Sequence, residues 1–340
     1  MTLWTEILSQ ADVLAAARER IRAEVVEIGQ WIRESQPTYV VLAARGSSDN
    51  AGRYAQYLWG ARNRLNVALT TPSLFGAYSS PPNLDGALVV GISQSGESPD
   101  LLAVLAEANR QGRPTLAITN NSSSPMAELA SRSLDLRVGE EKAVAATKTY
   151  TGQLLAVALL SAAIAGGDNE EDFALLSPVI DEVLSGSGEM VPAAAALAGH
   201  DRCVVIGRGF HHATAHEWAL KIAELSYLVA QPFSSADFRH GPMALIEPDL
   251  AVLAIATDGR LFSEIADLLN EIQSAGAKVV AISDRHDLPA EHLIRIPTIP
   301  EWLSPIPAIV AAQVFTYHLT VARGHDPDRP RGLRKVTRTV

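Results

Sequence analysis

The chain has 340 residues, 47% of them hydrophobic and 19% charged, which is enough apolar material for two domains that each bury a core. Its net charge of −10 excludes a nucleic-acid surface, because such a surface must present positive charge, and its single cysteine, Cys203, excludes a disulfide framework and a cysteine-built zinc site. The first residues lack the basic and apolar pattern of a signal peptide, and no apolar run is long enough to span a bilayer, so we expect a cytoplasmic protein with no membrane partner.

The predicted elements begin with an amphipathic helix and continue with short apolar strands. Over residues 1–35, apolar side chains recur at threes, fours and sevens, which is the spacing of one helix face. Three continuous apolar runs follow, Tyr39–Ala44, Ala87–Ile92 and Thr115–Thr119, and helical patterns separate them. Strands that are apolar on both faces and alternate with helices predict a parallel sheet covered on both sides.

The same pattern recurs in the second half of the chain. Its apolar strands are Cys203–Ile206, Ala251–Ala256 and Lys278–Ile282, and Gly46 after the first strand has a counterpart in Gly209. A repeat on this scale indicates duplicated domains, so we predict an α/β protein with two tandem, doubly wound, flavodoxin-like parallel sheets. The predicted parts are an N-terminal helical segment at 1–37, a first domain at 38–165, a helical connection at 166–198, a second domain at 199–324 and a C-terminal tail at 325–340.

The segment Gly91–Asp100 has the composition of an anion site. It leaves a buried strand and enters a helix, with Ser98 as the expected N-cap and Pro99 at the first helical position. A helix N-terminus offers backbone N–H groups, and the serine hydroxyls add neutral donors. The segment lacks the Gly-Lys-Ser/Thr ending of a nucleotide P-loop. It therefore predicts a phosphate cradle, although an ordinary serine-capped turn has the same pattern.

Residues 93–98, Ser-Gln-Ser-Gly-Glu-Ser, resemble the phosphosugar-binding loop of sugar-isomerase (SIS) domains, specifically those of the isomerase half of the glutamine–fructose-6-phosphate amidotransferases. Further motifs resemble the same family in the same order and cover the chain from residue 38 to its end. They are Arg45–Ser48, Glu141 with Val144–Lys148, Glu217–Lys221 with Glu224–Tyr227, Arg239–Pro242 and the tail Pro330–Lys335. The resemblance implies two tandem SIS domains and an enzyme that acts on a sugar 6-phosphate.

The resemblance assigns the catalytic roles to the second domain and the tail. It implies that Glu224 moves a proton between C1 and C2 of the sugar, that His240 opens the ring, and that Lys335 forms a Schiff base with the open-chain ketose. A carboxylate, an imidazole and an amine are suitable groups for this chemistry. Lys221, one helical turn before Glu224, would tune its charge or assist proton transfer, and Glu217 lies one turn earlier again. Taken without the resemblance, a solvated helix face with i, i+3 and i, i+4 ion pairs explains the helical trio better than catalysis does.

The resemblance also implies the substrate-binding residues and the assembly. The sugar hydroxyls are assigned to backbone groups of Val144 and Ala145. The family implies a homodimer with shared active sites, in which His240 reaches into the neighbouring subunit's pocket. The phosphate is assigned to Ser47, Ser48, Ser93, Gln94, Ser95 and Ser98.

No cofactor and no metal are expected. His211, His212 and His216 follow the Gly209 turn at a spacing that suggests ligands, but no set of carboxylates accompanies them. We therefore interpret the three histidines as loop and helix-entry residues.

Three functions are compatible with these residues. The first is a deaminase or isomerase that converts glucosamine 6-phosphate to fructose 6-phosphate and ammonia. The second is a deglycase or lyase on another substituted sugar 6-phosphate, and the third is a non-catalytic sugar-phosphate sensor. A sensor of this kind would carry a basic helix-turn-helix, which residues 1–35 lack. Residue 2 is threonine and no cysteine lies near the start, so we expect no glutaminase domain and no built-in source of ammonia.

Overall fold

The structure, a computed structural model, describes residues 2–335 and divides the chain into two compact units. Met1 and residues 336–340, the last five residues of the predicted tail, lie outside the described part. The first-sheet unit contains Asp12–Glu141 and Lys148–Glu170 together with Arg334 and Lys335. The second-sheet unit contains Thr2–Ala11, Lys142–Thr147 and Glu171–Leu333.

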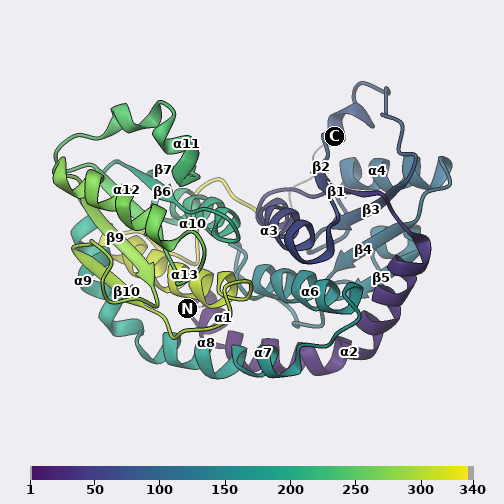
Figure 1. Cartoon of the computed structure of the whole chain (residues 1–340), viewed down its shortest axis with the longest axis horizontal. Helices are drawn as coiled ribbons and strands as arrows, with labels where there is room; N and C mark the ends of the chain where they lie inside the picture. The colour runs from purple at the N-terminus through teal and green to yellow at the C-terminus, as the bar shows by residue number, and fades with distance from the viewer. Residues whose placement is uncertain (1, 336–340) are drawn as a thin grey trace. The chain divides into compact units, whose positions relative to one another are not determined.

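The first-sheet unit is built on five parallel strands in the order β2-β1-β3-β4-β5 (Figure 1). The strands are β1 (Tyr39–Ala43), β2 (Val67–Leu69), β3 (Ala87–Ile92), β4 (Thr115–Thr119) and β5 (Arg132–Asp135). The helices of this unit are α2 (Gln10–Ser35), α3 (Ser47–Asn63), η1 (Pro72–Leu74), α4 (Pro99–Arg110), α5 (Pro125–Leu129) and α6 (Lys148–Ile164). The chain places β2 on one side of β1 and places β3, β4 and β5 on the other side, so the order in which strands are added reverses between β1 and β3.

The second-sheet unit repeats this topology with the order β10-β9-β8-β6-β7. All of its paired strands are parallel, as in the first sheet, so the predicted pair of doubly wound α/β domains is confirmed. The strands are β6 (Arg202–Ile206), β7 (Val229–Phe233), β8 (Ala251–Ile255), β9 (Lys278–Ser283) and β10 (His292–Arg295). The helices are α1 (Thr2–Leu8), α7 (Glu170–Ala174), α8 (Leu176–Ser185), η2 (Ser187–Met190), α9 (Val191–Leu197), α10 (His211–Ser226), α11 (Ser235–Arg239), η3 (Pro242–Leu245), α12 (Phe262–Ser274) and α13 (Pro305–Ala322).

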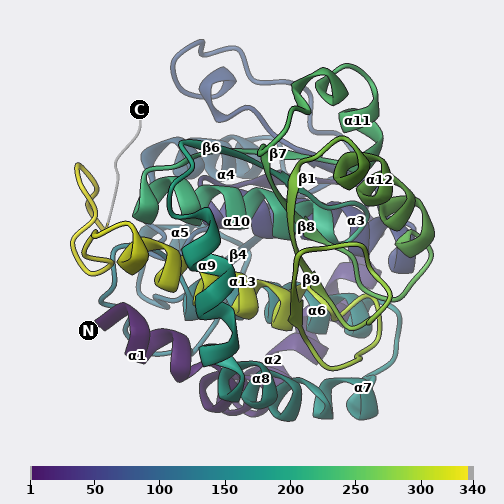
Figure 2. The ribbon, with the colours of Figure 1, turned by 90° about the vertical axis from the view of Figure 1, so that its left-hand side faces the viewer.

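One helix at the centre of each unit is apolar on every face. In the first-sheet unit α6 is buried over nearly its whole length and packs against α3. In the second-sheet unit α13 packs against α8, α9 and α10 (Figure 2). Of the helices in residues 2–335, α13 is the one long and apolar enough to cross a membrane, but 83% of it is buried inside the protein. Such burial is characteristic of a core helix.

Candidate active site

The first group of predicted site residues lies at the carboxyl ends of β1 and β3, the two strands between which the order of strand addition reverses. β1 and β3 are neighbours, with Ala43 opposite Gly91, so the loops at their carboxyl ends meet at one edge. Ligands bind at this edge in doubly wound sheets. The loop after β3 turns through Gly96, which has φ +66°, and a Cβ there would lie 2.2 Å from the Ser124 hydroxyl oxygen. Only glycine fits this turn, so the shape of the predicted phosphate loop depends on it.

Two serine hydroxyls of this loop, residues 93–98, stabilise the turn and one does not. Ser93 Oγ accepts the Gly96 N–H at 3.1 Å, and Ser95 Oγ accepts the Glu97 N–H at 3.4 Å. Ser98 is the N-cap of α4, as predicted, but its side chain makes no capping hydrogen bond. The Ser98 hydroxyl therefore remains available to an anion at the start of α4.

The loop after β1 adds further polar groups. Ser48 Oγ accepts a hydrogen bond from Gln153 Nε2 on α6 at 2.9 Å, whereas the hydroxyl of the half-buried Ser47 makes no hydrogen bond within residues 2–335. Arg45 precedes both serines, and its half-exposed guanidinium donates to Asp100 at 2.7 Å. This loop brings a cation to the edge of the sheet where the serine-rich loop also begins.

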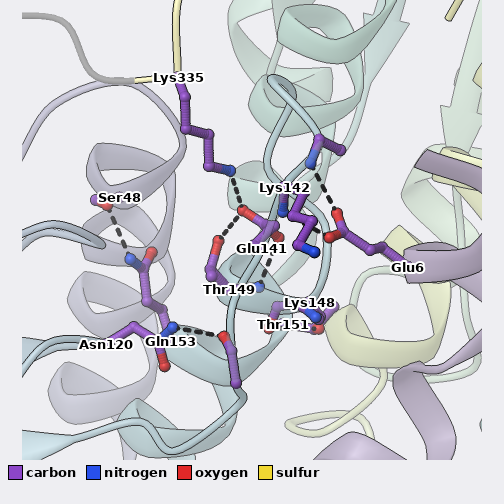
Figure 3. Close-up of polar contacts among 12 residues, drawn as sticks. Glu6, Ser48, Asn120, Glu141, Lys142, Lys148, Thr149, Thr151, Gln153 and Lys335 are labelled. Carbon is purple, nitrogen blue, oxygen red and sulfur yellow. Dashed lines mark hydrogen bonds and ion pairs between the residues drawn. The ribbon is translucent and has the colours of Figure 1, made fainter. Parts of the chain in front are cut away.

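A cavity of ≈ 640 Å³ opens in the same unit beside Gln94 and Glu141. Its wall includes Asn120, which follows β4 and whose side chain donates to the carbonyl of Gly139 at 2.8 Å (Figure 3). The volume is within the range of small-molecule sites. The first-sheet unit thus has room for a ligand next to the serine-rich loop.

Lys335 contacts a buried carboxylate that the sequence analysis did not place in the site. Its ammonium lies 2.5 Å from Glu141 Oε2, and the Glu141 side chain is 0% exposed (Figure 3). Thr149, at the start of α6, donates to the same carboxylate from its backbone N–H at 3.0 Å and from its hydroxyl at 2.7 Å. Burial would raise the pKa of Glu141, but the Lys335 charge and these hydrogen bonds more than offset it and hold that pKa below its usual value.

The two sugar-binding residues proposed next to Glu141 belong to the second-sheet unit. Val144 is half-buried and Ala145 is buried. Their loop is held by Glu6 of α1, whose carboxylate accepts the backbone N–H of Lys142 at 2.6 Å and that of Ala143 at 3.1 Å (Figure 3). The sequence pattern predicts the N-terminal helix only as an amphipathic segment and carries no signal of this contact.

Two members of the α10 trio, Lys221 and Glu217, are buried rather than solvated, and Glu224 is partly exposed. Lys221 Nζ lies 2.5 Å from Glu224 Oε2 and 3.5 Å from Glu217 Oε1, and the Lys221 and Glu217 side chains are 2% and 0% exposed. The alternative explanation as a solvated helix face is therefore wrong, because α10 packs against α13 and the sheet on this side. Two carboxylates here share one ammonium in a poorly hydrated place, an arrangement that is weak evidence for stability and common at catalytic sites.

Within the described residues of the second-sheet unit, no contact links His240 to the α10 trio. It follows α11, and its side chain is exposed. Its imidazole makes no hydrogen bond or ion pair with another residue of the described chain. Within its own unit, the histidine thus has no fixed partner.

The tail is attached to the end of α10. Arg331 donates its backbone N–H to the Tyr227 hydroxyl at 2.8 Å, and its guanidinium lies 3.8 Å from the centre of the Tyr227 ring. His325 packs edge-on against the same ring at 4.7 Å. Tyr227 ends α10 in a left-handed conformation only three residues after Glu224. The segment that leads to Lys335 is therefore fixed to the helix that carries Glu224.

The histidines at the start of α10 are packed as helix-entry residues. The His211 ring contacts the hydroxyls of Thr257 at 2.8 Å and Ser304 at 2.9 Å, and burial lowers the pKa of His211 to about 3. The rings of His212 and His216 are 4.6 Å apart and edge-on. His211 is consequently neutral and held by hydroxyl groups.

Comparison with known proteins shows the same architecture. The SIS domain family matches residues 35–163 and 196–323. The chain is 33% identical to a glutamine–fructose-6-phosphate aminotransferase (isomerizing) of Thermococcus kodakarensis over 95% of its own length and 55% of that protein, so it spans about half the length of this curated relative.

Two solved structures share the fold across nearly the whole chain. The C-terminal domain of glucosamine-fructose-6-phosphate aminotransferase from Francisella tularensis superposes with a TM-score of 0.86 at 22% identity, covering 97% of this chain and 98% of that one. A glucosamine-6-phosphate deaminase from Thermotoga maritima superposes with a TM-score of 0.78 at 23% identity over the full length of both chains. At these identities the likeness concerns the fold alone.

Proposed function

Because this chain belongs to the SIS domain family, we propose that it is an amino-sugar phosphate deaminase and isomerase that converts glucosamine 6-phosphate to fructose 6-phosphate and ammonia. The observation that carries the proposal is the ion-paired trio of α10. The buried Lys221 ammonium contacts both Glu217 and Glu224. Glu224 is the more accessible of the two, at 23% exposed, so it is the carboxylate that can exchange a proton with a substrate.

The proposed reaction uses groups that the chain itself supplies. His240 assists opening of the sugar ring, and Glu224 moves a proton from C2 to C1. The C2 amine loses a proton as the C1 oxygen gains one, so that C1 becomes a hydroxymethyl group and the amine becomes an imine. The neutral amine of Lys335 adds to C2, and the C2–ammonia bond breaks as ammonia leaves. Water then adds to C2 of the Lys335 Schiff base, and fructose 6-phosphate departs while the lysine is regenerated.

We propose that the phosphate is bound by the serine-rich loop and the loop after β1. Their hydroxyls and backbone N–H groups lie at the starts of α3 and α4, where the helix dipole favours an anion. This assignment includes Ser47, Ser48, Ser93, Gln94, Ser95 and Ser98.

Replacing both Ser47 and Ser98 by alanine is expected to weaken binding of glucosamine 6-phosphate by about 1–3 kcal/mol, the scale of hydrogen bonds to a charged group. Neither hydroxyl is used by the loops themselves, so the fold should be unchanged. Isothermal titration calorimetry measures the effect, and unphosphorylated glucosamine is the control ligand. Equal affinity of the variant and the wild type for the phosphorylated sugar would place the phosphate elsewhere.

The reaction itself is tested by proton NMR of the purified protein with glucosamine 6-phosphate, its N-acetyl form, and fructose 6-phosphate with and without ammonium. We expect fructose 6-phosphate and ammonia from the first substrate. Turnover only of sugar phosphates with a larger substituent on nitrogen would instead identify a deglycase. Binding without any turnover would identify a sensor.

We further propose a cytoplasmic homodimer in which His240 serves the partner's site. The exposed, unengaged imidazole supports this assembly. A mixture of inactive Glu224→Gln and His240→Ala chains is then expected to regain roughly a quarter of wild-type activity, because half of the dimers are mixed and each mixed dimer has one intact site. Activity is measured after subunit exchange, with each variant alone as the control. An active monomer in light scattering would contradict the proposal.

A further inference from the structure

Glu141 touches the reacting atom of the proposed mechanism. Its Oε2 lies 2.5 Å from Lys335 Nζ, and both residues belong to the first-sheet unit (Figure 3). Resting on the Schiff-base role proposed above for Lys335, we infer that Glu141 is the counter-ion of that Schiff base: its carboxylate stabilises the positive iminium that forms when Lys335 joins the sugar. Glu141 would thus be a catalytic residue rather than a structural partner of the tail.

The contacts of Glu141 suit this role. Its side chain is 0% exposed, so its charge is weakly screened by water. Thr149 donates two hydrogen bonds to the carboxylate, and these hold it in place beside the lysine nitrogen. The carboxylate is thus positioned to stabilise a positive charge on that nitrogen.

The other charges near the pair do not replace Glu141. Glu140 and Lys142 are its chain neighbours, Arg334 precedes Lys335, and Lys148 begins α6 (Figure 3). The Lys335 ammonium is the charge that lowers the pKa of Glu141. Glu141 is therefore the carboxylate that would lie against the Schiff-base nitrogen.

The chemical step ends on a cation that Glu141 contacts. The neutral amine of Lys335 adds to C2, and loss of water or ammonia forms the C=N bond, which is protonated as the iminium. The carboxylate favours this iminium over its neutral form, and so extends the protonated Schiff base to higher pH. Removing the carboxylate charge should therefore move the alkaline limb of the pH profile of adduct trapping to lower pH.

The test uses Glu141→Gln in the full chain, with fructose 6-phosphate and sodium cyanoborohydride, which reduces the protonated iminium. The rate at which the sugar phosphate's mass appears on the Lys335 peptide is measured between pH 5 and pH 10. We expect the alkaline limb of the profile to move to lower pH by about 1–3 pH units, the effect of removing an opposite charge at contact distance. Trapping at pH 9 should fall at least tenfold, while trapping at pH 6 is retained.

Two controls separate charge from structure. Glu140→Gln removes a neighbouring carboxylate and should leave the profile unchanged. Glu141→Asp keeps the charge and should keep the alkaline limb near its wild-type position even if trapping is slower. A uniform loss of trapping at every pH in Glu141→Gln, or an unshifted profile, would overturn the counter-ion role and leave the proposed function intact. No adduct at Lys335 in the wild type, with turnover still present, would overturn the Schiff base and the counter-ion together.

Discussion

Replacing Lys335 by arginine or methionine is expected to abolish conversion of glucosamine 6-phosphate, with a loss on the order of 10³-fold or more, because neither residue can form a Schiff base. Arginine keeps a positive charge beside the buried Glu141. Methionine leaves that carboxylate without the ammonium that lies 2.5 Å away in the wild type. Binding of the sugar phosphate should persist in both variants, since the phosphate loops lie in residues 45–98. Turnover is measured by proton NMR and binding by calorimetry.

The two substitutions distinguish chemistry from loss of structure. If the tail lysine served only to pair with Glu141, Lys335→Arg would keep most of the activity and Lys335→Met would lose it. Equal loss in both variants, with unchanged thermal unfolding of Lys335→Arg, supports the nucleophile. Full activity of Lys335→Arg would contradict the mechanism and return the tail lysine to a structural role.

Replacing Glu224 by glutamine is expected to slow turnover by about 10²–10⁴-fold, the usual contribution of a positioned acid–base group. Glutamine has the same shape and can still accept a hydrogen bond from Lys221, but it cannot carry a proton between C2 and C1. The direct measurement is exchange of the C1 proton of fructose 6-phosphate with solvent deuterium, followed by NMR. We expect this exchange to disappear with the activity.

The steps that do not involve proton transfer provide the control for this variant. Reductive trapping of fructose 6-phosphate at Lys335 should continue in Glu224→Gln, because adduct formation at C2 precedes the transfer. Glu224→Asp should recover part of the exchange. Unchanged deuterium exchange in Glu224→Gln would show that another group, with Glu217 the nearest carboxylate on α10, moves the proton.

The central strands were predicted from the sequence because their signal is local. β1, β3, β4, β6, β8 and β9 are buried on both faces, so each is a continuous apolar run. The edge strands were not predicted, and β2 and β5 show why: they are short and partly exposed, with burial confined to single positions. A strand with one bonded neighbour needs less apolar surface, so its residues carry little of this signal. The repeat of the same pattern was sufficient to predict two domains.

The serine-rich loop was also predicted from consecutive residues, since a strand end, a glycine turn and a helix start are all adjacent in the chain. The environment of the reactive groups was decided by tertiary structure. Glu141 and Lys335 are separated by 194 positions, and Tyr227 and Arg331 by 104, so no spacing rule could pair them. Likewise the i, i+3 and i, i+4 spacing on α10 is the same whether its charged residues are exposed or buried. The packing of α13 against that helix, which the spacing does not predict, buries Lys221 and Glu217. Local periodicity thus determined the elements and the phosphate loop, whereas the burial and the partners of each charge required the folded chain, because both depend on residues distant in sequence.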